Sequence, residues 1–199
     1  MDRFPFTTKD GRPGVVRPAR PSDARACLAV VWEATNERPR TLMTSPEEFW
    51  TPRQWRKHRH EWGPDGVTLV AEVGGKVVAN LGAERGRRPR ERHVAEFGVT
   101  VGRAHRDQGV GRALLSTLEE WAREQGVERI VLRVFDSNAR ARALYEKMGY
   151  SSEGVDRHAV KFPDEYIDAV RMAKFLKTPA DAPRATPTTG SKATKRPVG

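Results

Sequence analysis

The chain has 199 residues, of which 37% are hydrophobic, and a formal net charge of +10. This length is enough for one domain with a sizeable core. The sequence has no run of roughly 18 apolar residues and no signal-peptide pattern, so we expect a cytoplasmic protein without a membrane partner. The single cysteine, Cys27, excludes an internal disulfide and a cysteine-rich zinc site. The histidines lack metal-ligand spacing, so no metal is predicted.

The excess of positive charge is compatible with nucleic acid, an anionic surface or an anionic cofactor. The sequence shows neither a recognition-helix pattern nor the aromatic and basic pattern of a single-strand platform, so nucleic acid is not expected. Arginine far outnumbers lysine, a composition that suggests a bacterium with a GC-rich genome. We therefore favour an anionic cofactor as the reason for part of the charge.

The amino-terminal part of the chain predicts an arm, one strand and two helices. Residues 1–13 are polar with Gly and Pro, which favours a flexible arm, and residues 15–17 form a candidate strand. A helix is predicted to begin at residues 21–23. Residues 45–48 read Ser-Pro-Glu-Glu, a capping box with proline at the first helical position, which predicts the start of a second helix.

Three antiparallel strands are predicted next. Residues 67–73 and 76–81 are largely apolar and flank Gly74-Gly75, a pair that suits the tight turn of a hairpin. A basic loop follows at residues 85–92, and the run Val94–Val101 then predicts the fourth strand of the chain.

The segment directly after this fourth strand is the most informative part of the sequence. Gly109 and Gly111 stand in a short loop, and an amphipathic helical pattern follows and ends near Gly126. Two glycines at this spacing let several backbone N–H groups point into one concavity, and a helix start adds about half a positive charge. This combination favours binding of a diphosphate without a lysine.

Another strand, turn and helix are predicted next. Residues 130–134 predict a buried fifth strand, Asn138 lies in a turn of capping residues, and residues 139–148 predict a short helix that carries Tyr145. The strand–helix–strand unit over residues 94–134 implies that its two strands are parallel neighbours. Two further strands are expected before a Pro-, Thr- and Lys-rich tail, residues 178–199, whose composition predicts disorder.

Two motifs together resemble the GNAT N-acetyltransferase superfamily. The first is Arg-x-x-Gly-x-Gly at residues 106–111, between a strand and a helix, and the second is Leu-Tyr-Glu-x-x-Gly-Tyr at residues 144–150, after Asn138. The resemblance is to the branch that acts on polyamines, ribosomal-protein N-termini and small amines. It implies transfer of an acetyl group from acetyl-CoA directly to a primary amine in a ternary complex.

The resemblance also implies an α/β fold over residues 14–177. This fold has a central, twisted mixed sheet of about seven strands, splayed between strands four and five, with about four flanking helices. A dinucleotide-binding fold is rejected because its glycine loop follows the first strand, whereas here the loop follows the fourth. Dimers are frequent in the family, so a homodimer is possible.

The implied cofactor site comprises Val99, Val101, Arg106, Gln108, Gly109, Val110, Gly111, Arg112 and Asn138. The backbone of the two valines would pair with the pantetheine arm, and the N–H groups of residues 108–112 would hold the pyrophosphate. The chain departs from the commonest pattern at Asp107, where many relatives have glycine, and at Arg103, where many have proline. A carboxylate near a diphosphate costs affinity unless it points away or pairs with an arginine.

The resemblance implies that Tyr145 is the general acid, because a phenol near the departing sulfur can donate a proton. An N–H near Val99 would polarise the thioester carbonyl. Glu96 is the first choice for the base, and strand alternation places it on the face of Gly98 and Thr100 unless a bulge intervenes. The alternative interpretations are an aromatic ring packed in the core and a solvated carboxylate.

Glu84 and His93 are alternative bases, and Glu33, Glu37 and Glu84 are expected acceptor contacts. A small-molecule amine, a protein N-terminus or a lysine ranks above a polyamine, since the chain is basic. Two other functions stay open: a catalytically silent module that binds acyl-CoA, and a nucleic-acid-associated protein that uses the basic tail.

Overall fold

The computed structural model describes residues 3–43 and 51–177. The predicted helix start at residues 45–48 and the tail at residues 178–199 lie outside the described residues. Eight strands form one mixed sheet in the order β1-β2-β3-β4-β5-β6-β8-β7. The strands are β1 (Phe4–Thr7), β2 (Pro13–Pro18), β3 (Gly66–Val73), β4 (Lys76–Arg85), β5 (Val94–Val101), β6 (Arg129–Phe135), β7 (Ser151–Lys161) and β8 (Tyr166–Phe175). The α-helices are α1 (Ala24–Thr35), α2 (Pro52–Trp62), α3 (Val110–Glu124) and α4 (Ala139–Lys147).

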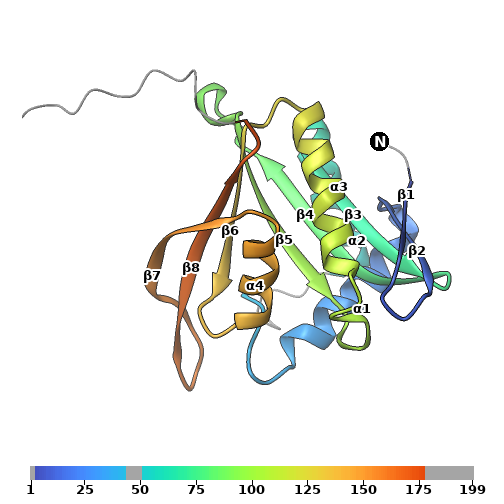
Figure 1. Cartoon of the computed structure of the whole chain (residues 1–199), viewed down its shortest axis with the longest axis horizontal. Helices are drawn as coiled ribbons and strands as arrows, with labels where there is room; N and C mark the ends of the chain where they lie inside the picture. The colour runs from blue at the N-terminus through green and yellow to red at the C-terminus, as the bar shows by residue number, and fades with distance from the viewer. Residues whose placement is uncertain (1–2, 44–50, 178–199) are drawn as a thin grey trace, which may run out of the picture.

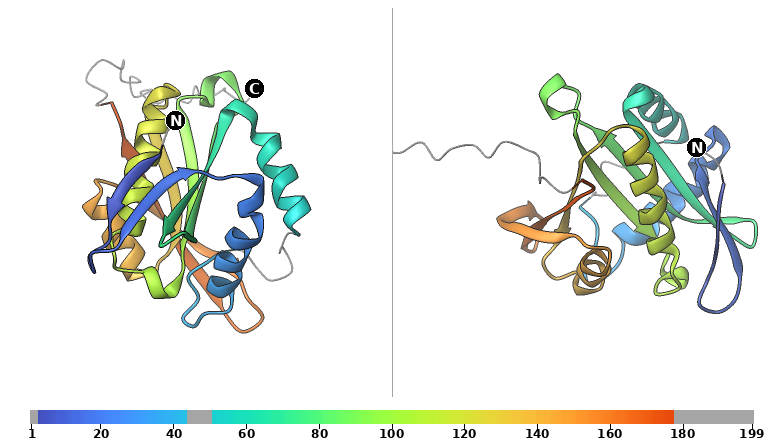
Figure 2. Two further views of the ribbon diagram at one scale, coloured as in Figure 1. Left: turned by 90° about the vertical axis from the view of Figure 1, so that its right-hand side faces the viewer. Right: turned by 45° about the horizontal axis from the view of Figure 1, so that its top comes forward.

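The sheet is covered on both faces, which confirms the predicted α/β class. Helices α3 and α4 lie on one face and α1 and α2 on the other (Figures 1 and 2). Strand alternation separates two buried layers: Leu69 belongs to the larger cluster that includes Leu118 of α3, whereas Val70 packs with Cys27 of α1 and Trp55 of α2. Cys27 is therefore a buried core residue on the face of α1 that packs against the sheet.

The prediction of a flexible arm at residues 1–13 is wrong for the part that forms β1. Phe4–Thr7 pairs antiparallel with β2, which adds an eighth strand to the expected seven. Phe4 and Phe6 alternate with exposed residues, and both pack against the main core. Gly14 makes room for this packing, because a Cβ atom there would lie 2.4 Å from the Phe6 ring.

Helix α2 begins with a capping box. Pro52 is the first residue of α2, and Thr51 precedes it. The Gln54 N–H donates to the Thr51 hydroxyl at 3.3 Å, and the Thr51 N–H donates to the Gln54 side-chain oxygen at 2.8 Å. This reciprocal pair satisfies two backbone donors at the helix start.

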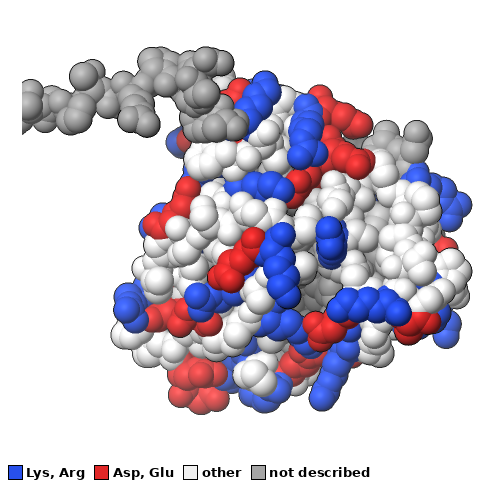
Figure 3. Space-filling model, viewed as in Figure 1, with Lys and Arg blue, Asp and Glu red and all other residues white. Residues whose placement is uncertain are grey.

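Charged side chains of both signs are interspersed on the face that carries α3 and α4 (Figure 3). Several are paired, such as Lys174 with Glu119 at 2.6 Å. A nucleic-acid footprint would instead gather positive charge in one patch or stripe, which this face does not show. No helix among the described residues is long and apolar enough to cross a membrane, and within the same residues no group of His, Cys, Asp or Glu could hold a metal ion.

The sheet opens between β5 and β6. These parallel strands share only three register pairs, from Val94 with Arg129 to Glu96 with Val131, whereas β4 and β5 stay paired as far as Val101. The two strands then diverge, as Figure 1 shows between the green β5 and the orange β6. The splay predicted between the fourth and fifth strands of the sequence is therefore found between β5 and β6.

Candidate active site

The opening between β5 and β6 forms a cleft of about 850 Å³. It is reached from both faces of the sheet, because Tyr145 of α4 and Glu84 of β4 both line it. Most of the predicted site residues lie on its wall: Glu84, Glu96, Val99, Val101, Arg106, Gly109, Gly111, Arg112, Asn138 and Tyr145. Gln108, Val110, Glu33, Glu37 and His93 are not among the lining residues.

The edge of β5 that faces the cleft carries backbone groups without a strand partner. The Gly102 N–H donates to Val78 and the Val94 carbonyl accepts from Gly86, both at 2.9 Å, so peptide groups of even-numbered residues face β4. Peptide groups alternate along a strand. Those of Val99 and Val101 therefore face β6, which has already diverged. The uninterrupted β4–β5 register excludes the bulge that could have changed this assignment.

The loop after β5 presents a helix start to the cleft. Gly109 has a φ of +88° and ends the loop, and the first backbone bond of α3 runs from the Ala113 N–H to the Gly109 carbonyl. The N–H groups of residues 110–112 consequently have no partner within the helix. Val110 itself is a core residue, 1% exposed, so only its backbone can serve the cleft.

Two residues of this loop have special backbone requirements. Asp107 has a φ of +60°, a left-handed conformation that Asp and Asn tolerate better than other non-glycine residues. This conformation suits the glycine that the family resemblance implies at position 107. At Gly111, a Cβ atom would lie 2.9 Å from Leu144, so its absence lets α3 approach α4 closely.

Arg106 connects three parts of the site rather than pointing a free guanidinium into the cleft. Its Nε donates to the Val101 carbonyl at 2.9 Å, and its Nη atoms pair with the Glu37 carboxylate at 2.8 Å. Both side chains are nearly buried. Glu37, predicted as an acceptor contact, thus neutralises Arg106, which was predicted to bind the cofactor.

Glu33 and His93, two other predicted site residues, lie away from the cleft wall. Glu33 accepts a hydrogen bond from the Arg103 N–H at 3.3 Å, so it holds the loop instead of lining the cleft. His93 lies at the start of the β5 segment, where its carbonyl accepts from Glu128 and Arg129. Both positions argue against direct contact with an acceptor.

Glu84 and Glu96 lie side by side on the α1 face of the sheet. They are direct register partners in the β4–β5 pair, and both line the cleft. Glu96 is 61% exposed and lies 3.9 Å from the Arg133 guanidinium, while Glu84 accepts from Arg87 at 2.7 Å. This side of the cleft thus brings together two carboxylates and one partly exposed guanidinium.

Tyr145 approaches the gap from the opposite face. Its ring makes edge contacts with Phe97 and Tyr150, at centroid distances of 5.9 and 6.0 Å. Burial raises the pKa of Tyr145 to about 12, because the phenolate would be poorly solvated there. Its hydroxyl has no hydrogen-bond partner among the described residues, and it lies on the cleft wall. Asn138 caps α4 through its side-chain oxygen, which accepts from the Ala141 N–H at 3.2 Å.

Sequence reasoning missed several lining residues. Arg133 could have been found, since it is an exposed charge within an otherwise apolar strand. Residues 41–43, which line the cleft, could not have been found, because contacts distant in sequence position this segment. The adjacent Arg40 pairs with Asp164 and Glu165, and its guanidinium lies 4.2 Å from the centre of the Phe162 ring. Lys9 also lines the cleft, although its segment was predicted to be a loose arm.

Comparison with known proteins identifies the family of this chain. Residues 31–150 match the family model described as "Acetyltransferase (GNAT) family". The chain belongs to this family. The L-amino acid N-acetyltransferase AaaT of Escherichia coli K12 is 39% identical over 110 residues, which are 53% of this chain and 66% of AaaT. The chain thus spans less than two thirds of the curated relatives it matches.

Solved structures of the family are similar over most of the chain. The ribosomal-protein-alanine N-acetyltransferase of Brucella melitensis has a TM-score of 0.71 and 29% identity, and the match covers 80% of this chain and 98% of that one. The structure of yncA from Salmonella typhimurium, determined with its cofactor acetyl-CoA, has a TM-score of 0.74 and 22% identity, with coverages of 86% and 99%. At that identity, the second likeness shows the fold alone.

Proposed function

We propose that the protein transfers the acetyl group of acetyl-CoA directly to a primary amine, with both substrates bound at once. One observation carries the proposal: a single cleft joins the unpaired edge of β5, the start of α3 and Tyr145. The first suits an extended amide chain as a strand-like partner, and the second suits a diphosphate. The family membership agrees with this arrangement, and the yncA structure, which has the same fold, was determined with acetyl-CoA.

The residues divide the chemistry between the two faces of the sheet. The cofactor is proposed to enter on the α3 and α4 side, and the acceptor on the α1 side, where Glu96 lies. Glu96 takes the proton of the incoming ammonium, directly or through water, so that the neutral amine attacks. The Val99 N–H stabilises the oxyanion as the N–C bond forms. Tyr145 donates its hydroxyl proton to sulfur as the C–S bond breaks, so coenzyme A leaves as the thiol. The proton that the new amide nitrogen releases restores the Tyr145 phenol.

The acceptor is proposed to carry a carboxylate beside its amine, as an amino acid does. Glu84 and Glu96 offer negative charge to an ammonium, and Arg133 lies 3.9 Å from Glu96 with about half of its side chain exposed. Arginine binds carboxylates through two parallel hydrogen bonds. The likeness to an L-amino acid N-acetyltransferase points the same way. A protein N-terminus is the second candidate, suggested by the ribosomal-protein-alanine relatives.

Thiol release from acetyl-CoA, measured against amino acids, their amides, polyamines and peptides, tests the proposal. We expect turnover with amino acids, a clear loss with the matching amides, and loss of turnover in the Tyr145→Phe variant. Turnover with amides equal to that with amino acids would remove the role of Arg133. Binding of acetyl-CoA without turnover of any acceptor would instead favour a catalytically silent module.

A further inference from the structure

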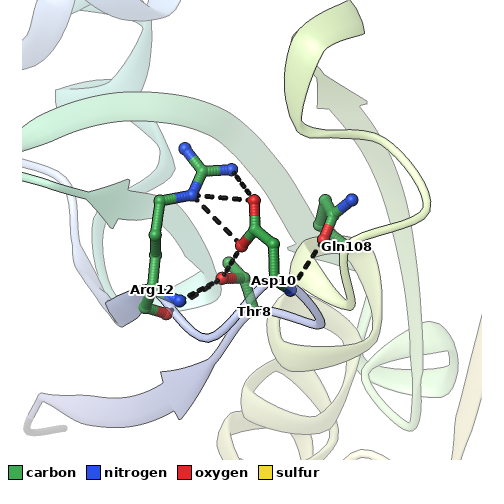
Figure 4. A network of polar contacts seen from close by, with 4 residues as sticks. All are labelled: Thr8, Asp10, Arg12 and Gln108. Carbon is green, nitrogen blue, oxygen red and sulfur yellow. Dashed lines mark hydrogen bonds and ion pairs between the residues drawn. The ribbon is translucent and has the colours of Figure 1, made fainter.

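The turn between β1 and β2 touches the loop that starts α3. The Lys9 N–H donates to the Gln108 carbonyl and the Asp10 N–H to the Gln108 side-chain oxygen, both at 3.2 Å. Figure 4 shows the contact between Gln108 and Asp10 from close by, with the Gln108 side chain directed toward the turn. The two segments are about a hundred residues apart in the chain, so the fold brings them together through the sheet.

The turn is stiffened by its own polar contacts. The Thr8 hydroxyl is bonded to Asp10 and Arg12, and the Asp10 carboxylate pairs with the Arg12 guanidinium at 2.7 Å. Two backbone bonds, Thr8 N–H to Arg12 and Gly11 N–H to Thr8, close the turn at 2.9 Å each. Thr8 is 3% exposed, although its neighbours in the turn are exposed. The backbone that carries Lys9 is thus held in one place beside Gln108.

The charges around the start of α3 do not balance the phosphate groups of coenzyme A, so a further cation could bind them. Arg106 is already neutralised by Glu37, and Asp107 adds a carboxylate to the same wall. Arg112 and Lys9 also line the cleft, and Lys9 is bonded to Gln108 through its own backbone N–H. The nucleotide end of coenzyme A carries a pyrophosphate and a 3′-phosphate, which exceed the half charge that a helix start supplies.

We propose that the β1–β2 turn is part of the cofactor site, and that Lys9 binds a phosphate group at the nucleotide end of acetyl-CoA. Lys9 lines the cleft and is anchored to Gln108 through its own backbone. A lysine ammonium is a common point-charge partner of phosphate. The turn lies outside residues 31–150, the part that matches the family model, so that match does not itself indicate the contact. The inference rests on the proposed use of acetyl-CoA.

Calorimetric binding of coenzyme A, dephospho-coenzyme A and pantetheine to the full chain tests this inference. We expect Lys9→Ala to weaken coenzyme A binding about tenfold and to make it less dependent on salt, with pantetheine unaffected. The control is Lys76→Ala, which removes an exposed lysine that does not line the cleft. A loss confined to coenzyme A assigns Lys9 to the 3′-phosphate, and an equal loss for dephospho-coenzyme A assigns it to the pyrophosphate.

Three results would overturn the inference. These are unchanged coenzyme A affinity in Lys9→Ala, the same loss in Lys76→Ala, and an equal loss for pantetheine, which would indicate a general disturbance of the cleft. The outcome is separate from that of the acetyl-transfer proposal. A wild-type protein that binds coenzyme A but acetylates nothing still tests Lys9, whereas one that binds no coenzyme A overturns both proposals.

Discussion

Replacing Tyr145 by phenylalanine removes one hydroxyl and leaves the ring. The ring contacts with Phe97 and Tyr150 persist, so the packing of α4 on the sheet is retained. The hydroxyl has no protein partner among the described residues, so its removal orphans no buried donor or acceptor. We therefore expect the free energy of unfolding to change by less than about 1 kcal/mol. Acetyl transfer, by contrast, should slow about 10²- to 10⁴-fold, the range for loss of a general acid.

The pH profile gives an independent check on this residue. Burial raises the pKa of Tyr145 to about 12, so the phenol keeps its proton throughout the neutral and mildly alkaline range. Loss of activity with rising pH below about pH 11 cannot then come from Tyr145. The free energy of unfolding also depends on this group. The phenol of the unfolded chain ionises first, near pH 10, so the contribution of Tyr145 to stability falls between about pH 10 and 12. That loss should be smaller in the phenylalanine variant.

Tyr150→Phe is the matched control. Its ring touches that of Tyr145, but its hydroxyl is buried without a partner among the described residues, and Tyr150 does not line the cleft. Removing an unsatisfied buried hydroxyl should stabilise the fold by about 1 kcal/mol and leave turnover unchanged. The measurements are urea unfolding and steady-state thiol release. Full activity in Tyr145→Phe, or an equal loss in both variants, would refute the assignment of the acid.

Three further changes probe the rest of the cleft. Glu96→Gln should lower kcat about 10²-fold, with partial recovery at high pH, and a larger loss in Glu84→Gln would move the base to that residue. Gly111→Ala places a Cβ atom 2.9 Å from Leu144, so thermal unfolding should reveal a loss of about 1–2 kcal/mol, and an unchanged Tm would show that Leu144 yields freely. Asp107→Gly suits the φ of +60° and removes a carboxylate, so calorimetry should show coenzyme A binding tightened several-fold; unchanged affinity would mean that the carboxylate faces away from the phosphates.

Local patterns predicted the parts of the site that depend on neighbours in sequence. The glycine spacing at 109 and 111 identified the start of α3, and the pattern around Tyr145 identified α4. The splay also followed, because it was implied by the same family resemblance. These features are encoded within short segments, where helix starts, turns and alternation leave a readable trace.

Contacts between distant segments were beyond this reasoning. Glu37 was predicted to meet an acceptor, yet it pairs with Arg106, 69 residues away, and no local pattern indicates that partner. The strand β1 was missed because four residues give too short an alternation to outweigh the adjacent Gly and Pro. Its effect reaches the site, since β1 carries the turn that meets Gln108.

The early divergence of β5 and β6 has a consequence for local opening of the protein. The portion from β1 to β5 and the portion from β6 to β8 share sheet bonds only along residues 94–96 and 129–131, at one end of the cleft. Amide hydrogens of Val99 and Val101, turned toward the gap, should exchange with solvent deuterium quickly in the free protein. A bound pantetheine chain that pairs with them would slow this exchange, so the cofactor would complete the sheet that the polypeptide leaves open.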